Sequence, residues 1–151
     1  MKKYSTWLKT AGILQFIAAF FQATAFFANE QPKNETEKQL FSLMDTYKFD
    51  FGAGIHRTMN NLVLVLSACF FLVCLLDGLM NWYLLKKKVD PNIMRGVINI
   101  NLVVFGILFA LTARFAFWPP IILSGLILLF LVLSRLTITT AIKTKNSLVV
   151  A

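Results

Sequence analysis

The sequence has little of what metal or redox chemistry requires. It contains one histidine, His56, and two cysteines, Cys69 and Cys74. A single histidine excludes a bis-histidine haem within one chain and argues against a zinc site. The cysteines lie five residues apart, on different faces of a helix, and no Cys-x-x-Cys motif is present. We therefore predict neither a metal nor a cofactor.

Acidic residues are also scarce, with 7 Asp and Glu against 15 Lys and Arg and a formal net charge of +8. Such a charge can indicate a nucleic-acid-binding protein when the basic residues gather on one soluble face. Here they lie between long apolar runs, so we predict no nucleic-acid partner. Hydrophobic residues make up 58% of the chain, which is typical of a membrane protein rather than a soluble domain of this size.

Long polar segments are lacking outside residues 29–58. The rest of the chain forms four apolar runs, over residues 8–28, 61–85, 96–117 and 120–142. A helix of about 20 apolar residues crosses the hydrocarbon core of a bilayer. The sequence therefore predicts an all-α integral membrane four-helix bundle, in which residues 1–151 form a single four-span transmembrane domain. The alternative for the first run is a cleaved signal peptide, because Ala23-Thr24-Ala25 resembles a cleavage site.

The basic residues that flank the runs predict the orientation of the chain. Nine are expected near one face, namely Lys2, Lys3, Lys9, Lys86, Lys87, Lys88, Arg95, Lys143 and Lys145. Five are spread over the longer opposite side, namely Lys33, Lys38, Lys48, Arg57 and Arg114. Cytoplasmic loops carry the excess of Lys and Arg. We therefore expect both termini in the cytoplasm and predict a bacterial cytoplasmic membrane protein.

Residues 29–58 form the polar exterior segment. Thr36 followed by Gln39 resembles a capping box. Apolar residues then repeat at helical spacing, namely Leu40, Leu43, Met44 and Tyr47. The pattern predicts a short exterior amphipathic helix over 36–48, with its apolar face on the outer leaflet or against the bundle. The glycines of 49–54 allow a turn that directs the chain back to the membrane.

Prolines mark the starts of the third and fourth spans. Asp90 suits an N-cap and Pro91 a first helical position, so the third helix is expected to begin near Asn92. Pro119 and Pro120 can both stop one helix and start the next. The last two spans are therefore predicted to form a tight antiparallel hairpin.

Six polar side chains within the apolar runs form an inner set, namely Gln15, Asp77, Asn81, Asn99, Asn101 and Arg135. Asp77 lies nine residues before Lys86, and Arg135 lies eight before Lys143. At 1.5 Å per residue both lie roughly 12 to 13 Å from the same boundary. Since a lone charge at that depth is costly, we predict an Asp77–Arg135 ion pair. The inner set is either interhelical glue, an ion or proton path, or a pocket for a lipid head group.

A second polar set is expected on the exterior side, namely Asp50, His56, Arg57, Asn60, Asn61 and Arg114. Catalysis would need a nucleophile and a base within hydrogen-bond distance, and no spacing here indicates such a pair. We interpret His56 as an interfacial polar residue at a helix start, with a general base as the alternative. No catalytic residue is assigned, and whether the chain is an enzyme stays open.

Two segments carry a resemblance to known proteins. Residues 49–58 end in a Gly-x-x-Arg-Thr pattern before a long span, and Pro119-Pro120-Ile121-Ile122 opens the last span. In these segments and in layout, the chain resembles small uncharacterised bacterial four-span inner-membrane proteins of unknown function. The resemblance implies a four-helix membrane fold and no known activity.

These observations favour a non-enzymatic small integral membrane protein that serves as an accessory, assembly or lipid-interacting component. One alternative is a small transporter or channel subunit that uses Asp77. The other is a membrane enzyme with an exterior site at His56 and Arg57. Membrane lipids are the expected partners, and homo-oligomers and hetero-oligomers in the membrane both stay open.

Overall fold

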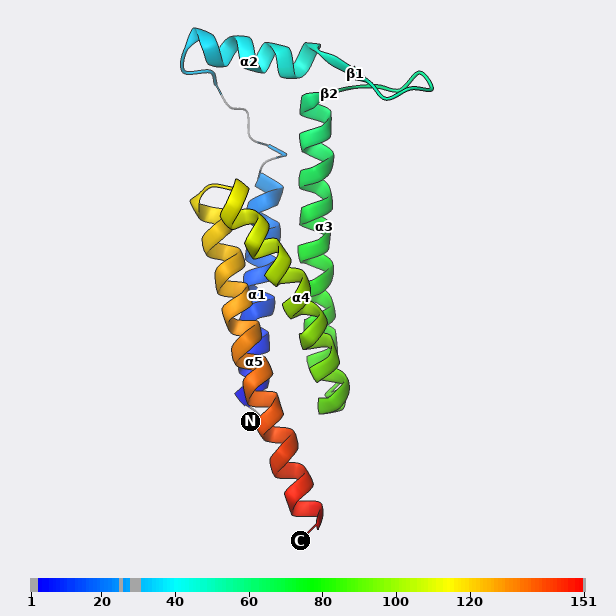
Figure 1. Cartoon of the computed structure of the whole chain (residues 1–151), viewed down its shortest axis with the longest axis vertical. Helices are drawn as coiled ribbons and strands as arrows, with labels where there is room; N and C mark the ends of the chain where they lie inside the picture. The colour runs from blue at the N-terminus through cyan, green and yellow to red at the C-terminus, as the bar shows by residue number, and fades with distance from the viewer. Residues whose placement is uncertain (1–2, 25, 28–30, 151) are drawn as a thin grey trace. The chain divides into compact units, whose positions relative to one another are not determined.

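A computed structural model describes residues 3–24, 26–27 and 31–150 of the chain (Figure 1). The elements in this part are α1 (Lys3–Thr24), α2 (Glu35–Thr46), β1 (Lys48–Asp50), β2 (His56–Thr58), α3 (Met59–Lys86), α4 (Pro91–Phe115) and α5 (Trp118–Val150). Apart from one short hairpin, the described elements are helical, as the sequence predicts. The expected boundary between the first run and the exterior segment, at residues 28 and 29, lies outside the described residues, as does Lys2.

Among the described helices, three segments are long and apolar enough to cross a membrane, namely Met59–Lys86, Pro91–Phe115 and Trp118–Thr140. Each is longer than the 20 or so residues that a bilayer core requires. They agree with the last three predicted runs, as expected of a membrane protein. Helix α1 is not among them, because Lys9, Gln15 and Gln22 interrupt its apolar residues.

The chain divides into two compact units. Unit 1 comprises Met1–Ala18 and Cys74–Ala151, and unit 2 comprises Ala19–Val73. Helices α1 and α3 therefore each contribute residues to both units.

The core of unit 1 is a set of single stripes, one on each helix. Helix α4 buries Met94, Ile98, Asn101 and Phe105, which recur every three or four residues and so share one face. On α5 the matching stripe is Ile127, Leu131, Ser134 and Ile138. Large apolar side chains outside the stripes are exposed, such as Val103 at 63%. So much exposed apolar surface is unusual for a soluble protein and suits helices surrounded by lipid.

Helices α4 and α5 form an antiparallel hairpin (Figure 1), with only Ala116 and Phe117 between them. Asp90 caps α4 because its Oδ1 accepts a hydrogen bond from the Asn92 amide at 2.8 Å, and Pro91 takes the first position. This confirms the predicted start. The Pro119-Pro120 pair lies in the first turn of α5, where a missing amide hydrogen breaks no intrahelical bond.

Within unit 1, α1 and α3 approach closely at Gly78. A Cβ built on Gly78 would lie 3.3 Å from the Phe16 ring and 3.5 Å from the Gln15 Cβ. A Cβ on Gly12 would lie 3.9 Å from the Gly78 carbonyl oxygen. Small residues at such a crossing let two helix backbones come together, and this contact brings the polar side chains of α1 and α3 within hydrogen-bond distance.

Helix α3 ends in a Schellman motif. The Val89 amide donates to the Leu84 carbonyl at 3.4 Å, and the Lys88 amide donates to the Leu85 carbonyl at 3.2 Å. Lys88 adopts a φ of 50°, the left-handed conformation in which such motifs usually place glycine. The run of three lysines at residues 86–88 therefore also carries the turn that ends α3.

In unit 2, α2 begins at Glu35, one residue before the predicted start. The capping residue is Asn34 rather than Thr36, since Asn34 Oδ1 accepts from the Glu37 amide at 2.8 Å. Glu37 in turn accepts from the Lys33 amide at 2.6 Å. The prediction of a helix is right and that of its capping box is wrong, because an Asn-x-x-Glu pair two residues upstream of Thr36 takes the role.

Strands β1 and β2 form an antiparallel hairpin, where the sequence predicts only a turn. Lys48 pairs with Thr58, Phe49 with Arg57, and Asp50 with His56. The connecting loop turns through three successive positive φ values, 79° at Gly52, 51° at Ala53 and 76° at Gly54. Glycine adopts such angles without a steric penalty, which explains why a five-residue loop can close here.

Candidate functional site

Four polar side chains in unit 1 form a hydrogen-bonded network among α1, α3 and α4. Gln15 Nε2 donates to Asp77 Oδ2 at 2.5 Å, and Asn81 Nδ2 donates to Gln15 Oε1 at 3.1 Å. Asn101 Nδ2 donates to Asn81 Oδ1 at 3.1 Å, and the Asn101 amide also lies beside the Asp77 carboxyl. The four residues form one cluster, and we call them the polar ring.

The polar ring is mostly closed to the outside. Gln15 and Asn81 are 0% exposed and Asn101 is 3% exposed, whereas Asp77 is half-buried. A buried polar group without a partner costs about 1–3 kcal/mol. In the described part of the chain, no buried side-chain nitrogen or oxygen lacks a partner. The ring therefore joins three helices without an uncompensated polar atom.

The chemistry of the polar ring is that of a closed network. Asn81 bonds to both other amides, Gln15 donates to the Asp77 carboxyl, and Asn101 lies beside that carboxyl. Oxygen ligands for a metal ion would instead converge on one point. Among the described residues, no three His, Cys, Asp or Glu side chains lie close enough to hold a metal ion.

Arg135 lies outside the polar ring. Its Nε donates to Asn99 Oδ1 at 2.5 Å, and its Nη1 donates to the Thr139 hydroxyl. Within the described residues no ion pair joins Asp77 to Arg135, so the predicted pair is not formed. Equal depth along two helices does not determine the direction in which their side chains point. Asp77 faces α1, whereas Arg135 bonds to α4 and along its own helix.

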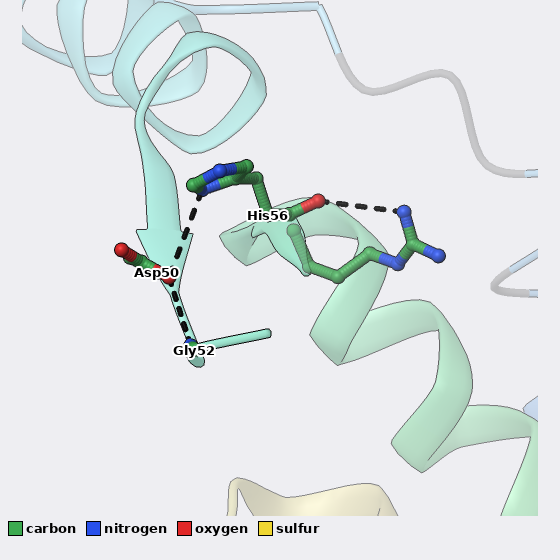
Figure 2. A network of polar contacts seen from close by, with 4 residues as sticks. Asp50, Gly52 and His56 are labelled. Carbon is green, nitrogen blue, oxygen red and sulfur yellow. Dashed lines mark hydrogen bonds and ion pairs between the residues drawn. The ribbon is translucent and has the colours of Figure 1, made fainter. Parts of the chain in front are cut away.

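The exterior set gives one exposed pair in unit 2. Asp50 and His56 face each other across the β1–β2 hairpin, as their register requires (Figure 2). His56 Nδ1 lies 3.9 Å from Asp50 Oδ1, too far for a hydrogen bond, and that oxygen accepts from the Gly52 amide at 2.8 Å. Both side chains are more than half exposed, so the pair is a solvated one at the hairpin turn.

The other exterior candidates have separate partners. Arg57 bonds to the His56 carbonyl oxygen at 3.4 Å, while Asn60 Nδ2 donates to Asp45 Oδ1 at 2.9 Å. Asn61 donates its backbone amide to the Thr58 hydroxyl. Arg114, in unit 1, lies over the Phe115 ring. The structure thus brings Asp50 and His56 together, and among the residues it describes no nucleophilic side chain is bonded to either.

Unit 1 has a groove where the beginning of α1 meets the end of α3. Its volume is about 320 Å³, and it is lined by Lys9, Trp82, Leu85 and Lys86. Lys9 and Lys86 are exposed, and Trp82 is 52% exposed. We call this the lysine groove. It combines two cations with an aromatic and an aliphatic wall.

A second groove lies beside the lysine groove and shares Leu85 with it. It has a volume of about 260 Å³, and its polar lining is Tyr4, Ser5 and Lys88. We call this the tyrosine groove. Lys88 is the one cation among its lining residues, whereas two lysines line the lysine groove.

Sequence reasoning identifies the members of the polar ring but not the two grooves. It uses Lys9 and Lys86 only for orientation, because nothing in their positions along the chain indicates that they line one groove. The one available signal is Trp82, an interfacial aromatic residue four positions before Lys86. Comparison of the chain with known protein families, curated proteins and solved structures finds no match.

Proposed function

We propose that the chain is a non-enzymatic, four-span integral membrane protein that acts as an accessory or assembly component and interacts with lipids. The observation that carries this proposal is the polar ring. Its one carboxyl group, on Asp77, accepts a hydrogen bond from the buried Gln15 amide of the neighbouring helix. Such a network suits a role in holding helices together in hydrocarbon.

Helix α1 is the fourth span in this proposal. Its Leu8 and Gln15 are fully buried in unit 1, and the Trp7 ring stacks on Phe130 of α5 at 5.7 Å. The Ser134 hydroxyl of α5 donates to the Tyr4 carbonyl oxygen at 3.1 Å. Because 22 residues reach roughly 33 Å as a helix, α1 is long enough to accompany the other three across the core.

The same proposal puts both termini in the cytoplasm, in a bacterial inner membrane. The lysine-rich end of α3 and the start of α1 then lie at the cytoplasmic boundary. The exterior segment then includes α2, whose Leu40 and Leu43 are 53% and 59% exposed. These residues are free to rest on the outer leaflet.

A small transporter or channel subunit is the second candidate function. The half-buried state of Asp77 favours it, because an intramembrane acid that is not fully enclosed can exchange protons. An exterior enzyme is the weaker candidate, since Asp50 and His56 are solvated and lack a partner nucleophile.

Reconstitution separates the first two candidates. We would place the full chain in liposomes that enclose a pH-sensitive dye and impose a proton gradient, with the Asp77→Asn variant as the matched control. We expect the same slow dye response for both proteins, since Asp77 is proposed to hold helices together. A faster response that is lost in Asp77→Asn would overturn the structural role and establish transport.

A further inference from the structure

The lysine groove holds two cations that no acid neutralises. Among the residues that the structure describes, neither Lys9 nor Lys86 forms an ion pair, and no acidic side chain lines the groove. Two ammonium groups that face one groove repel each other. An anion between them would replace that repulsion with two attractions, so the charge of the groove favours a negatively charged ligand.

The two lysines also lie at matching heights relative to the polar ring. Gln15 of α1 is bonded to Asn81 of α3, which fixes the register of the two antiparallel helices. Lys9 is six residues before Gln15 and Lys86 is five residues after Asn81, so they lie roughly 9 Å and 8 Å from this contact in the same direction. The two lysines therefore line the groove at one level, and Trp82, four residues before Lys86, lies roughly 6 Å closer to the polar ring.

We propose that the lysine groove binds the phosphate group of an anionic phospholipid, with Lys9 and Lys86 on the phosphate and Trp82 and Leu85 against its glycerol and upper acyl chains. Basic pockets between membrane helices on the cytoplasmic side are suited to such head groups. Trp82, about one turn deeper than Lys86, has an apolar ring face for the lipid and an N–H for the interface. The wall of Trp82 and Leu85 favours a lipid over a free phosphate ion.

The neighbouring tyrosine groove explains why the phosphate belongs in the lysine groove. Lys88 is the one cation among its lining residues. An anion there would meet one positive charge instead of two. The hydroxyl groups of Tyr4 and Ser5 suit the neutral part of a head group instead, such as a glycerol.

Native mass spectrometry of the purified full chain in mild detergent tests the assignment. The probes are dioleoylphosphatidylglycerol, dioleoylphosphatidylcholine and inorganic phosphate, each titrated separately. The test variant is Lys9→Gln/Lys86→Gln, and the control Lys33→Gln/Lys48→Gln removes the same charge from the exterior segment. A Lys9→Arg/Lys86→Arg variant keeps the charge and reports whether the site still forms.

We expect the wild-type chain to bind phosphatidylglycerol in preference to phosphatidylcholine. Loss of two lysines should weaken phosphatidylglycerol binding on the order of 30-fold, because each contributes about fivefold near an anionic head group. The exterior control and the arginine variant should bind within about threefold of wild type. In a Trp7→Phe/Trp118→Phe background, phosphatidylglycerol with brominated acyl chains should quench Trp82 fluorescence, and phosphatidylcholine should quench it less.

Three results would overturn the proposal. The first is that phosphatidylglycerol binding weakens equally in the groove variant and the exterior variant. The second is that the wild-type chain binds both lipids equally. The third is that inorganic phosphate at equal concentration displaces the lipid. The inference rests on the proposed function as a lipid-interacting protein, but its test is done in detergent. A failed lipid-binding test would therefore remove this inference only. If the liposomes also show no proton flux through Asp77, the structural role proposed for Asp77 is retained.

Discussion

At the scale of single residues, Asp77 takes a neutral partner where a charged one lies at the same height. Gln15 reaches it from α1 because Gly78 and Gly12 let the two backbones come together. Arg135 bonds to Asn99 and Thr139 instead. Two charged residues at one depth therefore have separate sets of partners, which makes a testable difference in how their substitutions combine.

We expect a double-mutant cycle to couple Asp77 to Gln15 and not to Arg135. Asp77→Ala and Gln15→Ala remove the two sides of one hydrogen bond, so the loss in the double variant should be smaller than the sum by about 0.5–2 kcal/mol. Asp77→Ala with Arg135→Ala should be additive to within about 0.5 kcal/mol. Thermal unfolding in detergent measures both cycles.

The second cycle is also the control for the first, because it keeps Asp77→Ala and changes only the partner. Coupling between Asp77 and Arg135 larger than that between Asp77 and Gln15 would restore the ion pair that the sequence predicts. It would also show that the contacts of the polar ring differ in detergent from those described above.

At the scale of elements, the ends of the helices depend on individual side chains. Asp90 and Pro91 start α4, and Asn34 with Glu37 starts α2. Helix α3 ends at Lys86, and Lys88 in the turn that follows has the left-handed conformation. A lysine in this conformation carries a steric cost that glycine avoids, so the end of α3 is less stable with Lys88 than it would be with glycine at this position.

We expect Lys88→Gly to stabilise the chain by about 0.5–1 kcal/mol, because glycine adopts the φ of 50° without the steric penalty of a Cβ atom. Lys87→Gly removes an equal charge from the preceding position, where no positive φ is required, and should give no gain. Thermal unfolding of both variants in the same detergent decides the matter. Equal changes would mean that charge, and not backbone conformation, controls this end of α3.

The elements could be predicted from the sequence to the extent that local chemistry decides them. The start of α4 at Asp90-Pro91 is such a case, since both residues act within one turn. The cap of α2 was open to two local solutions, Thr36 with Gln39 or Asn34 with Glu37, and the backbone adopts the second. The β1–β2 hairpin could not be predicted because three-residue strands have too little alternation to show a period.

At the scale of the whole molecule, the proposed four-span topology depends on the lysine bias. We expect reporter fusions after Lys88 and after Lys145 to report the cytoplasm, and a fusion after Lys38 to report the exterior, because nine basic residues hold one side inside. Paired phosphatase and fluorescent-protein reporters at each site check the result from both sides. A fusion after Lys145 that reports the exterior would mean that one of the four helices does not span.

The candidate sites differ in how far the sequence could reveal them. The members of the polar ring stand out because amides and an acid are rare in apolar runs, so their identity could be predicted. Their pairing could not, since it depends on the rotation of each helix about its axis. The lysine groove is a longer-range case, because Lys9 and Lys86 are 77 positions apart and become neighbours only through the register of α1 and α3.

The short link between α4 and α5 has a consequence for biogenesis. Only Ala116 and Phe117 lie between the two helices. Such a short link cannot stay in the translocation channel with α4 already in the lipid while α5 is still being synthesised. In the proposed topology they enter the bilayer as one hairpin, and Arg114 is the single charge between Arg95 and Arg135 that must cross. Ribosome-bound intermediates that end within α5 should therefore still hold α4 outside the lipid.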